Sequence, residues 1–148
     1  MRIAIIGYPG SGKRELTKYL ERKYFCPCLY LDDIFVNDTP DEIKNEMLNK
    51  FMNENISWAI EGDFVNNLFK ERMETADKIV IMKFNRIACL IKYLRNNKNP
   101  NKEEIKCILS GSRGKNYRKL YNQVMRTYSD KVVPLFNQAQ ALMLRDII

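Results

Sequence analysis

Arg2–Lys13 reads RIAIIGYPGSGK, an apolar run followed by a glycine-rich turn. The run Arg2–Ile6 is short and rich in β-branched residues, which predicts a buried strand that ends at Gly7. Beyond the glycines, apolar residues recur at helical spacing, namely at Leu16, Tyr19, Leu20 and Tyr24. The N-terminal segment therefore predicts a strand, a glycine-rich loop and an amphipathic helix, in that order.

Gly7–Lys13 has the spacing G-x-x-x-x-G-K, and we call this segment the glycine loop. Glycines at these positions let consecutive backbone N–H groups turn inward around phosphate oxygens, while the lysine reaches the β- and γ-phosphates. The positive end of the following helix adds to this attraction. We therefore expect the loop to bind the phosphates of ATP. The residues expected to contact the nucleotide are Gly7, Pro9, Gly10, Ser11, Gly12, Lys13 and Arg14.

Arg14 stands where this pattern usually has the serine or threonine that coordinates Mg²⁺. Two interpretations of this arginine remain open. Its fixed positive charge lies near the phosphates and partly replaces the ion, or its side chain lies out on the helix surface. Any Mg²⁺ must then depend on other residues.

The composition is that of one soluble globular domain, because the chain has 148 residues, of which 45% are hydrophobic, 11% aromatic and 29% charged. We therefore interpret residues 1–148 as a single domain that binds a nucleoside triphosphate. No run approaches the roughly 18 apolar residues of a membrane helix, and the apolar run after Met1 is too short for a signal peptide. These features predict a cytoplasmic protein without membrane contact.

The chain contains no histidine and four cysteines, which are Cys26, Cys28, Cys89 and Cys107. The absence of histidine excludes every mechanism that uses imidazole as a base or as the partner of a nucleophile. It also removes the commonest partner for zinc, and the cysteines form no C-x2-C pair, so we expect free thiols. Any acid or base chemistry must come from carboxylates, lysine or tyrosine.

The net charge of +7 is unevenly placed. Residues 1–74 carry ten basic and thirteen acidic side chains, whereas residues 75–148 carry fifteen and five. A basic half of this kind either handles phosphate groups or is merely solvated, and nucleic acid is a further possible partner.

Further along the chain, apolar runs alternate with helical patterns. Expected strands are Cys28–Leu31, Ile56–Ile60, Lys78–Phe84 and Ala141–Leu144. Expected helices are Asp41–Asn53, Arg86–Arg95 and a region from Glu103 to about Asn137, interrupted near Ser110–Gly114 and bent near Pro134. The alternation predicts an α/β fold of three layers, a five-stranded parallel sheet with helices on both faces. The polar residues 96–102 predict a mobile, lid-like loop.

The glycine loop resembles that of adenylate kinases and their small-kinase relatives. Four further segments resemble, in order, the bacterial DNA topology modulation (FlaR-related) proteins, which are adenylate-kinase-like P-loop proteins. These segments are Leu31-Asp32, Trp58–Phe64, Ala76-Asp77 with the strand that follows, and Arg86–Arg95. The resemblance covers roughly residues 1–100 and implies an adenylate-kinase-like P-loop NTPase fold and ATP-dependent kinase activity.

The chain also departs from these families. Adenylate kinases have glycine and threonine where this chain has Arg14-Glu15, and the Asp-Gly of the FlaR-related proteins is Glu61-Gly62 here. The arginines that such lids supply are mostly asparagine and lysine between Asn96 and Lys102. The departures make catalysis a weaker expectation than nucleotide binding.

Two carboxylates follow expected strands and are expected at the ligand crevice, which lies beyond the carboxyl ends of parallel strands. Asp32 would orient or deprotonate an acceptor hydroxyl or hold metal-bound water, and its alternative role is to cap a helix or turn, as we expect of Asp33. Glu61 would hold Mg²⁺ through water, and its alternative is a surface turn. Asp32 and Glu61 are thus the candidate metal ligands.

Phosphoryl transfer also needs positive charge over the phosphate oxygens. Arg95 borders the lid-like loop and is the leading candidate, so Lys13, Asp32 and Arg95 form the expected catalytic set. The sequence favours a small-molecule or nucleotide kinase that transfers the γ-phosphoryl group of ATP to an unknown acceptor. The alternative is a non-catalytic nucleotide-binding or nucleic-acid-associated regulatory protein, because Arg113–Tyr121 interleaves basic and aromatic residues.

Overall fold

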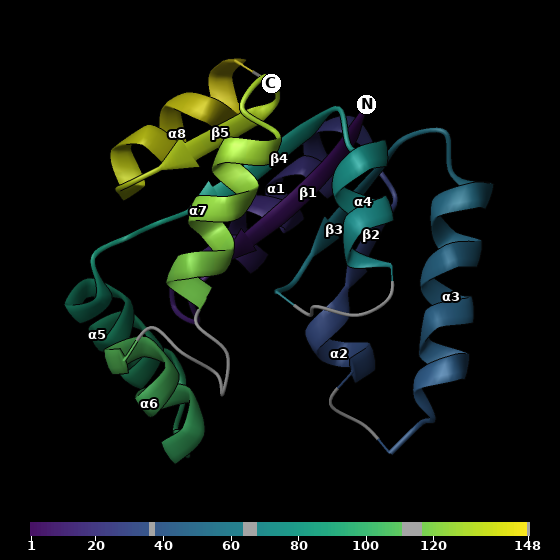
Figure 1. The fold of residues 1–148 in the computed structure, drawn as a ribbon. Coiled ribbons are helices and arrows are strands. Elements are labelled where there is room, and N and C mark those ends of the chain that lie inside the picture. The colour runs from purple at the N-terminus through teal and green to yellow at the C-terminus, as the bar shows by residue number, and fades with distance from the viewer. Residues whose placement is uncertain (36–37, 64–67, 111–116, 148) are drawn as a thin grey trace.

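The computed structural model describes residues 1–35, 38–63, 68–110 and 117–147 and contains a five-stranded sheet in the order β2-β3-β1-β4-β5 (Figure 1). The strands are β1 (Arg2–Gly7), β2 (Cys28–Tyr30), β3 (Trp58–Glu61), β4 (Lys78–Met82) and β5 (Val132–Leu135). Every neighbouring pair is parallel. The central place of β1 explains its almost unbroken apolar sequence, because a strand buried on both faces needs no polar alternation.

Helices cover both faces of this sheet. They are α1 (Lys13–Tyr24), α2 (Leu31–Phe35), α3 (Asp41–Glu54), α4 (Phe69–Thr75), α5 (Arg86–Asn96), α6 (Lys102–Ser110), α7 (Tyr117–Thr127) and α8 (Gln138–Ile147). Figure 1 shows α4 and α7 on the near side of β1 and α1 behind it. The expected three-layer α/β fold is confirmed.

The alternation of side chains along β1 divides the core into two clusters. Ile3 and Ile5 pack with Leu16 of α1 and with residues of α8. Ala4 and Ile6 face the other way and pack with residues of α3, α4 and α7. Each face of the sheet is thereby sealed by its own set of helices.

The prediction for the last forty or so residues is partly wrong. Ala141–Leu144 is not a strand but part of α8, and its buried members Ala141 and Leu144, three residues apart, meet the same core cluster from one helix face. The fifth strand is β5, and Pro134 lies inside it rather than at a helix bend. β5 is the edge strand next to β4, where a residue without an N–H group can be tolerated on the open side. The predicted interruption at residues 111–114 lies outside the described residues.

The predicted lid-like segment forms a short turn between α5 and α6. The hydroxyl group of Tyr93 accepts a hydrogen bond from the amide of Asn101 at 3.0 Å, and the side chain of Asn97 donates to the carbonyl of Tyr93 at 2.8 Å. The two helices therefore meet as a hairpin beyond the carboxyl ends of the strands. Its mobility stays a prediction.

The four cysteines are free thiols, as expected. In the part of the chain that the structure describes, no helix has both the length and the apolar character needed to cross a bilayer.

Ile60 within β3 and Ile56 just before it provide a test of the core. Ile60 is 1% exposed and Ile56 is 91% exposed. We expect Ile60→Ala to lower the free energy of unfolding by about 2–5 kcal/mol, because the lost side chain leaves a cavity. The same substitution at Ile56 should change it by less than about 0.5 kcal/mol. Urea denaturation of both variants measures the difference, and equal effects would contradict the strand boundary.

Candidate functional site

The glycine loop joins β1 to α1 and is held against α5. Gly10 has a φ of +77°, and a Cβ atom there would lie 2.2 Å from the carbonyl oxygen of Cys89 in α5. Gly12 has a φ of +90° and begins α1 without a side-chain cap. Only glycine permits both the left-handed backbone and this close approach. The uncapped first turn of α1 leaves N–H groups available to an anion.

Ser11 contributes an unusual group to this loop. Its side chain is fully buried, and its Oγ has no hydrogen-bond partner among the residues that the structure describes. A buried hydroxyl group without a partner is costly and calls for an explanation. A phosphate oxygen in the loop would supply one.

Lys13 lies beneath the loop with its side chain almost completely buried. Its Nζ donates to the carbonyl oxygens of Gly7 at 2.6 Å and of Tyr8 at 3.2 Å. It lies 3.3 Å from a carboxylate oxygen of Asp63 and 4.0 Å from one of Glu61. Burial alone would lower the pKa of Lys13, but the neighbouring carboxylates outweigh it and raise the pKa above its ordinary value. The lysine is therefore a buried ammonium ion.

Asp63 is the residue of this site that the sequence analysis missed. Its Oδ1 accepts hydrogen bonds from the amide of Gly7 at 2.7 Å and from the hydroxyl group of Tyr121 at 2.9 Å. Its other oxygen faces Lys13. The only sequence signal for Asp63 was its position two residues after a strand end, and many aspartates in turns occupy such a position. Tyr121 was considered only as part of a basic and aromatic segment.

Glu61 and Asp32 line one pocket of about 600 Å³ together with Lys13 and the glycine loop. Glu61 ends β3 and is 2% exposed, so it is not a surface turn residue. Burial raises its pKa to about 7, and the nearby Asp32 and Asp63 act in the same direction against the charges of Lys13 and Arg14. Asp32 lies in the first turn of α2. The two expected metal ligands therefore share a pocket with the expected phosphate loop.

Arg14 lines this same pocket, and its guanidinium is paired with a neighbouring helix. The guanidinium makes two hydrogen bonds to the carboxylate of Asp33 in α2, one of them 3.0 Å long, and lies 4.7 Å from the centre of the Tyr30 ring. About half of the Arg14 side chain is exposed. Both interpretations of Arg14 stay open, because the side chain is exposed and paired with Asp33 while its charge still borders the pocket and acts on Glu61.

Arg95 lies apart from Asp32 and Glu61. It lines a second pocket of about 550 Å³ between α5 and the turn from β5 to α8. Apolar side chains from Phe84, Ile91 and Phe136 share this lining with asparagine and glutamine side chains. Gly10 lines both pockets, so the second pocket adjoins the glycine loop.

An ion pair that the sequence did not reveal lies between the two pockets. Lys92 of α5 contacts Glu15 of α1 at 2.7 Å, and both residues line both pockets. The pair ties the first turn of α1 to α5 over the glycine loop. The residues are 77 positions apart, so no local pattern could have joined them.

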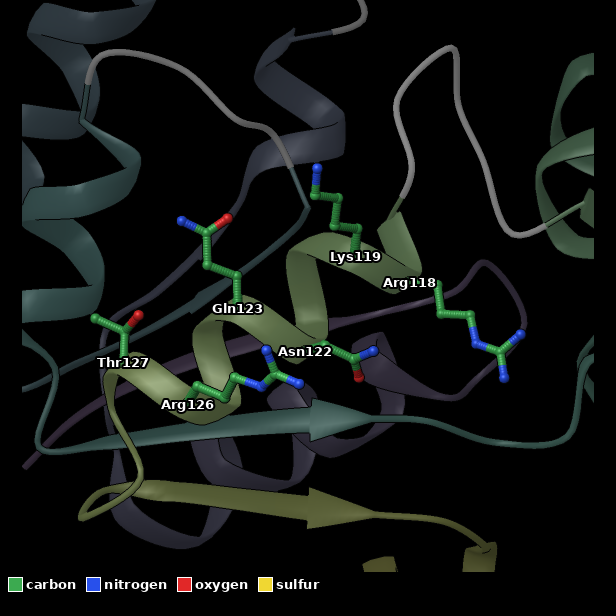
Figure 2. A pocket seen from close by; sticks show the side chains of 6 residues that line it. All are labelled: Arg118, Lys119, Asn122, Gln123, Arg126 and Thr127. Carbon is green, nitrogen blue, oxygen red and sulfur yellow. The ribbon is translucent and has the colours of Figure 1, made fainter.

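The outer side of α7 carries a separate, open groove of about 520 Å³ (Figure 2). Arg118, Asn122 and Arg126 recur every four residues along it, and a neighbouring row is formed by Lys119, Gln123 and Thr127. No acidic side chain of the described residues lines this groove. Of its lining residues, only Arg118 and Lys119 belong to the predicted basic and aromatic segment Arg113–Tyr121, of which residues 113–116 lie outside the described part.

Comparison with solved structures finds this fold in shikimate kinases. The chain aligns with "Shikimate kinase from Acinetobacter baumannii in complex with shikimate" at a TM-score of 0.66 and 14% identity, over 98% of this chain and 88% of that one. A shikimate kinase from Bacteroides thetaiotaomicron aligns at 0.57 and 17% identity, over 99% and 94%. An uncharacterized protein from Eubacterium ventriosum aligns at 0.63 and 17% identity, over 100% and 98%.

No protein-family model matches the sequence, and the search of curated proteins finds no match. The similarity to the solved structures nevertheless confirms the adenylate-kinase-like P-loop fold that the resemblance implied. The resemblance to DNA topology modulation proteins gains no support from these comparisons.

The raised pKa of Glu61 predicts a pH dependence of stability. Between about pH 4.5 and pH 7 folded Glu61 keeps a proton that the unfolded chain has already released. The folded state binds more protons in this window, so its stability falls as the pH rises. We expect the free energy of unfolding of the wild type, measured relative to Glu61→Gln, to fall by up to about 3 kcal/mol across the window.

Urea denaturation between pH 4.5 and 8 measures this difference in the absence of nucleotide. The exposed Glu42 provides a control, because Glu42→Gln should shift the whole curve without a comparable slope. If the wild type instead became more stable relative to Glu61→Gln as the pH rises, the assignment of Glu61 as a carboxyl group with a raised pKa would be wrong.

Proposed function

We propose that this protein is an ATP-dependent kinase whose glycine loop binds the triphosphate and whose acceptor lies beside Asp32. One observation carries the proposal: Lys13, the uncapped start of α1 and the carboxylates of Glu61 and Asp32 converge on one pocket. The partnerless hydroxyl of Ser11 lies in the same loop. This combination of a cationic cradle and paired carboxylates suits phosphoryl transfer, which depends on positioning and charge neutralisation.

The second pocket suits the nucleoside base. Its apolar side chains can sandwich a flat ring, and its asparagine and glutamine side chains can donate to and accept from ring nitrogens. It adjoins the phosphate loop at Gly10, so a base and its phosphates can occupy the two pockets together. Arg95 would then contact the nucleotide from the side of the base pocket.

The carboxylates fit Mg²⁺ that arrives with the nucleotide. Mg²⁺ prefers oxygen ligands, keeps several waters and is commonly held by one or two carboxylates together with phosphate oxygens. No group of three or more potential ligand side chains occurs in the described part of the chain, which suits a metal carried mainly by phosphates. Asp32 and Glu61 would hold the ion, and it would neutralise charge on the triphosphate. Arg14 lines the same pocket, where its charge is paired with Asp33.

Asp32 is the proposed proton acceptor. A hydroxyl oxygen of the acceptor attacks the γ-phosphorus, the bond from that phosphorus to the β–γ bridging oxygen breaks, and ADP leaves with the electron pair. The hydroxyl proton passes to Asp32, which lies on the α2 side of the pocket next to Phe35. Lys13 supports the charge that develops on the phosphate oxygens.

Calorimetric titration of ATP and ADP, with and without Mg²⁺, tests the proposal. We expect wild-type binding of ATP to strengthen with Mg²⁺ and Lys13→Ala to weaken it by about tenfold or more, because a charge-assisted contact is lost. Lys18→Ala removes an exposed lysine from the same helix and should leave affinity unchanged. Thermal melting of each variant separates lost binding from lost folding. Equal affinity of the Lys13→Ala variant and the wild type would refute the site.

A second candidate function, the binding of single-stranded nucleic acid, is favoured by the groove on α7. Its rows of arginine, lysine and amide side chains can donate to successive phosphates. α7 precedes β5, so it runs from the phosphate edge of the sheet towards the opposite edge. Arg126, near the end of α7, therefore lies away from the nucleotide site, and a nucleotide there would not account for its charge.

Fluorescence anisotropy with a labelled single-stranded oligonucleotide tests this function. If it is correct, Lys119→Ala combined with Arg126→Ala reduces the slope of log affinity against log salt by about 1.4, the value for two phosphate contacts. Lys18→Ala combined with Arg22→Ala removes the same charge from α1 and serves as the control. No binding at low salt, or equal effects of both pairs, would exclude the groove.

A further inference from the structure

The Lys13 ammonium already has partners within the protein. It donates to the carbonyl oxygens of Gly7 and Tyr8 and forms an ion pair with Asp63 at 3.3 Å. An ammonium has three donors and no more. A phosphate oxygen that approaches the lysine to which the loop pattern directs it therefore competes with these partners.

Of these partners, Asp63 is the one that competes with phosphate by charge. It is an anion in a buried setting, 5% exposed, where electrostatic attraction is stronger than in water. It reaches Lys13 because the chain turns at Gly62, whose φ is +142° and whose α-carbon lies against the side chain of Leu31. The amide of Gly62 donates to the carbonyl oxygen of Ile5 at 3.0 Å, which fixes the turn to β1.

Asp63 does not depend on Lys13 alone. The amide of Gly7 and the hydroxyl group of Tyr121 both donate to it, at 2.7 and 2.9 Å. Tyr121 is held in place in turn, since it is 1% exposed and its ring meets that of Tyr8 edge-on at 5.4 Å. When Lys13 leaves, two hydrogen bonds still satisfy the Asp63 carboxylate.

We infer that Asp63 is a positioning residue that holds Lys13 retracted under the glycine loop until phosphate displaces it, and that Tyr121 of α7 sets how readily the exchange occurs. The inference rests on the proposed binding of a triphosphate at this loop. In the empty site, the Asp63 carboxylate occupies Lys13, and the phosphate of an incoming nucleotide must compete with it for the ammonium. A residue that only supported the fold would not compete with the ligand.

The two partners should act in opposite directions. Asp63→Asn keeps an oxygen that accepts from Gly7 and Tyr121 but removes the charge that attracts Lys13 and repels phosphate. Its affinity for ATP should rise by about three- to tenfold. Tyr121→Phe keeps the ring against Tyr8 but removes one donor to Asp63, which then depends more on Lys13. Its affinity for ATP should fall by about two- to fivefold.

Calorimetric titration of ATP into the wild type and both variants, at one pH and salt concentration, measures these changes. Glu42→Gln is the control for charge, because Glu42 is exposed on α3 outside the pocket and its loss removes the same single negative charge. This variant should bind ATP within about twofold of the wild type, since a screened surface charge contributes little. Thermal melting confirms that each variant is folded.

Asp63→Ala separates the two roles of the carboxylate. It loses the acceptor for Gly7 as well as the charge, so it should melt at a lower temperature than Asp63→Asn. Equal or weaker ATP binding by a folded Asp63→Asn variant, beside a wild type that binds ATP, would overturn the role of Asp63 alone. An equal rise for Glu42→Gln would do the same. A wild type that binds no nucleotide would overturn the proposed function, and the exchange with it.

Discussion

The buried ammonium of Lys13 is the constraint around which the site is built. A charge removed from water must be paired and hydrogen-bonded, or it loses its proton. Here two backbone carbonyl oxygens and the carboxylates of Asp63 and Glu61 meet that requirement, and against the effect of burial the carboxylates raise the pKa of the lysine. These partners come from the ends of β1 and β3, which the parallel sheet brings side by side. The strand order thus supplies the anions that the loop lysine needs when no phosphate is present.

The burial of this site also changes the ionisation of Glu61. The carboxylates of Asp63 and Glu61 lie beside one ammonium with Asp32 nearby, and burial raises the pKa of Glu61 to about 7. A site with surplus buried carboxylates is well suited to take up further positive charge, whether a proton or a cation that accompanies a nucleotide. The glycine loop is also tightly packed. Gly10 lies directly against α5, and Glu15 and Lys92 join α1 to α5 across it, so the proposed nucleotide pockets are formed by elements already packed together.

The uneven charge of the chain takes on a definite meaning in the fold. The basic half contributes α5, α6 and α7, and Figure 1 shows α5 and α6 beyond the carboxyl ends of the strands, where phosphates are expected. The more acidic half supplies the carboxylates at the ends of β2 and β3. Positive and negative groups therefore meet at one edge of the sheet. The groove on α7 extends the basic surface away from that edge (Figure 2), and a mononucleotide site does not require it.

Local pattern was sufficient for β1, the glycine loop and α1, because their spacing expresses backbone geometry that any fold must respect. It was also sufficient to place Asp32 and Glu61 at strand ends, and parallel strands bring such ends together. It failed at the C-terminus, where Val132–Leu135 and Ala141–Leu144 are both short and apolar, and only the free edge beside β4 determines which of them is the strand. Local pattern could not show that Arg14 pairs with Asp33. Nor could it show that Asp63 accepts hydrogen bonds from Gly7 and Tyr121, which lie 56 and 58 positions away in the sequence. Those contacts depend on which helices and strands pack together, and the sequence specifies them only through the whole fold.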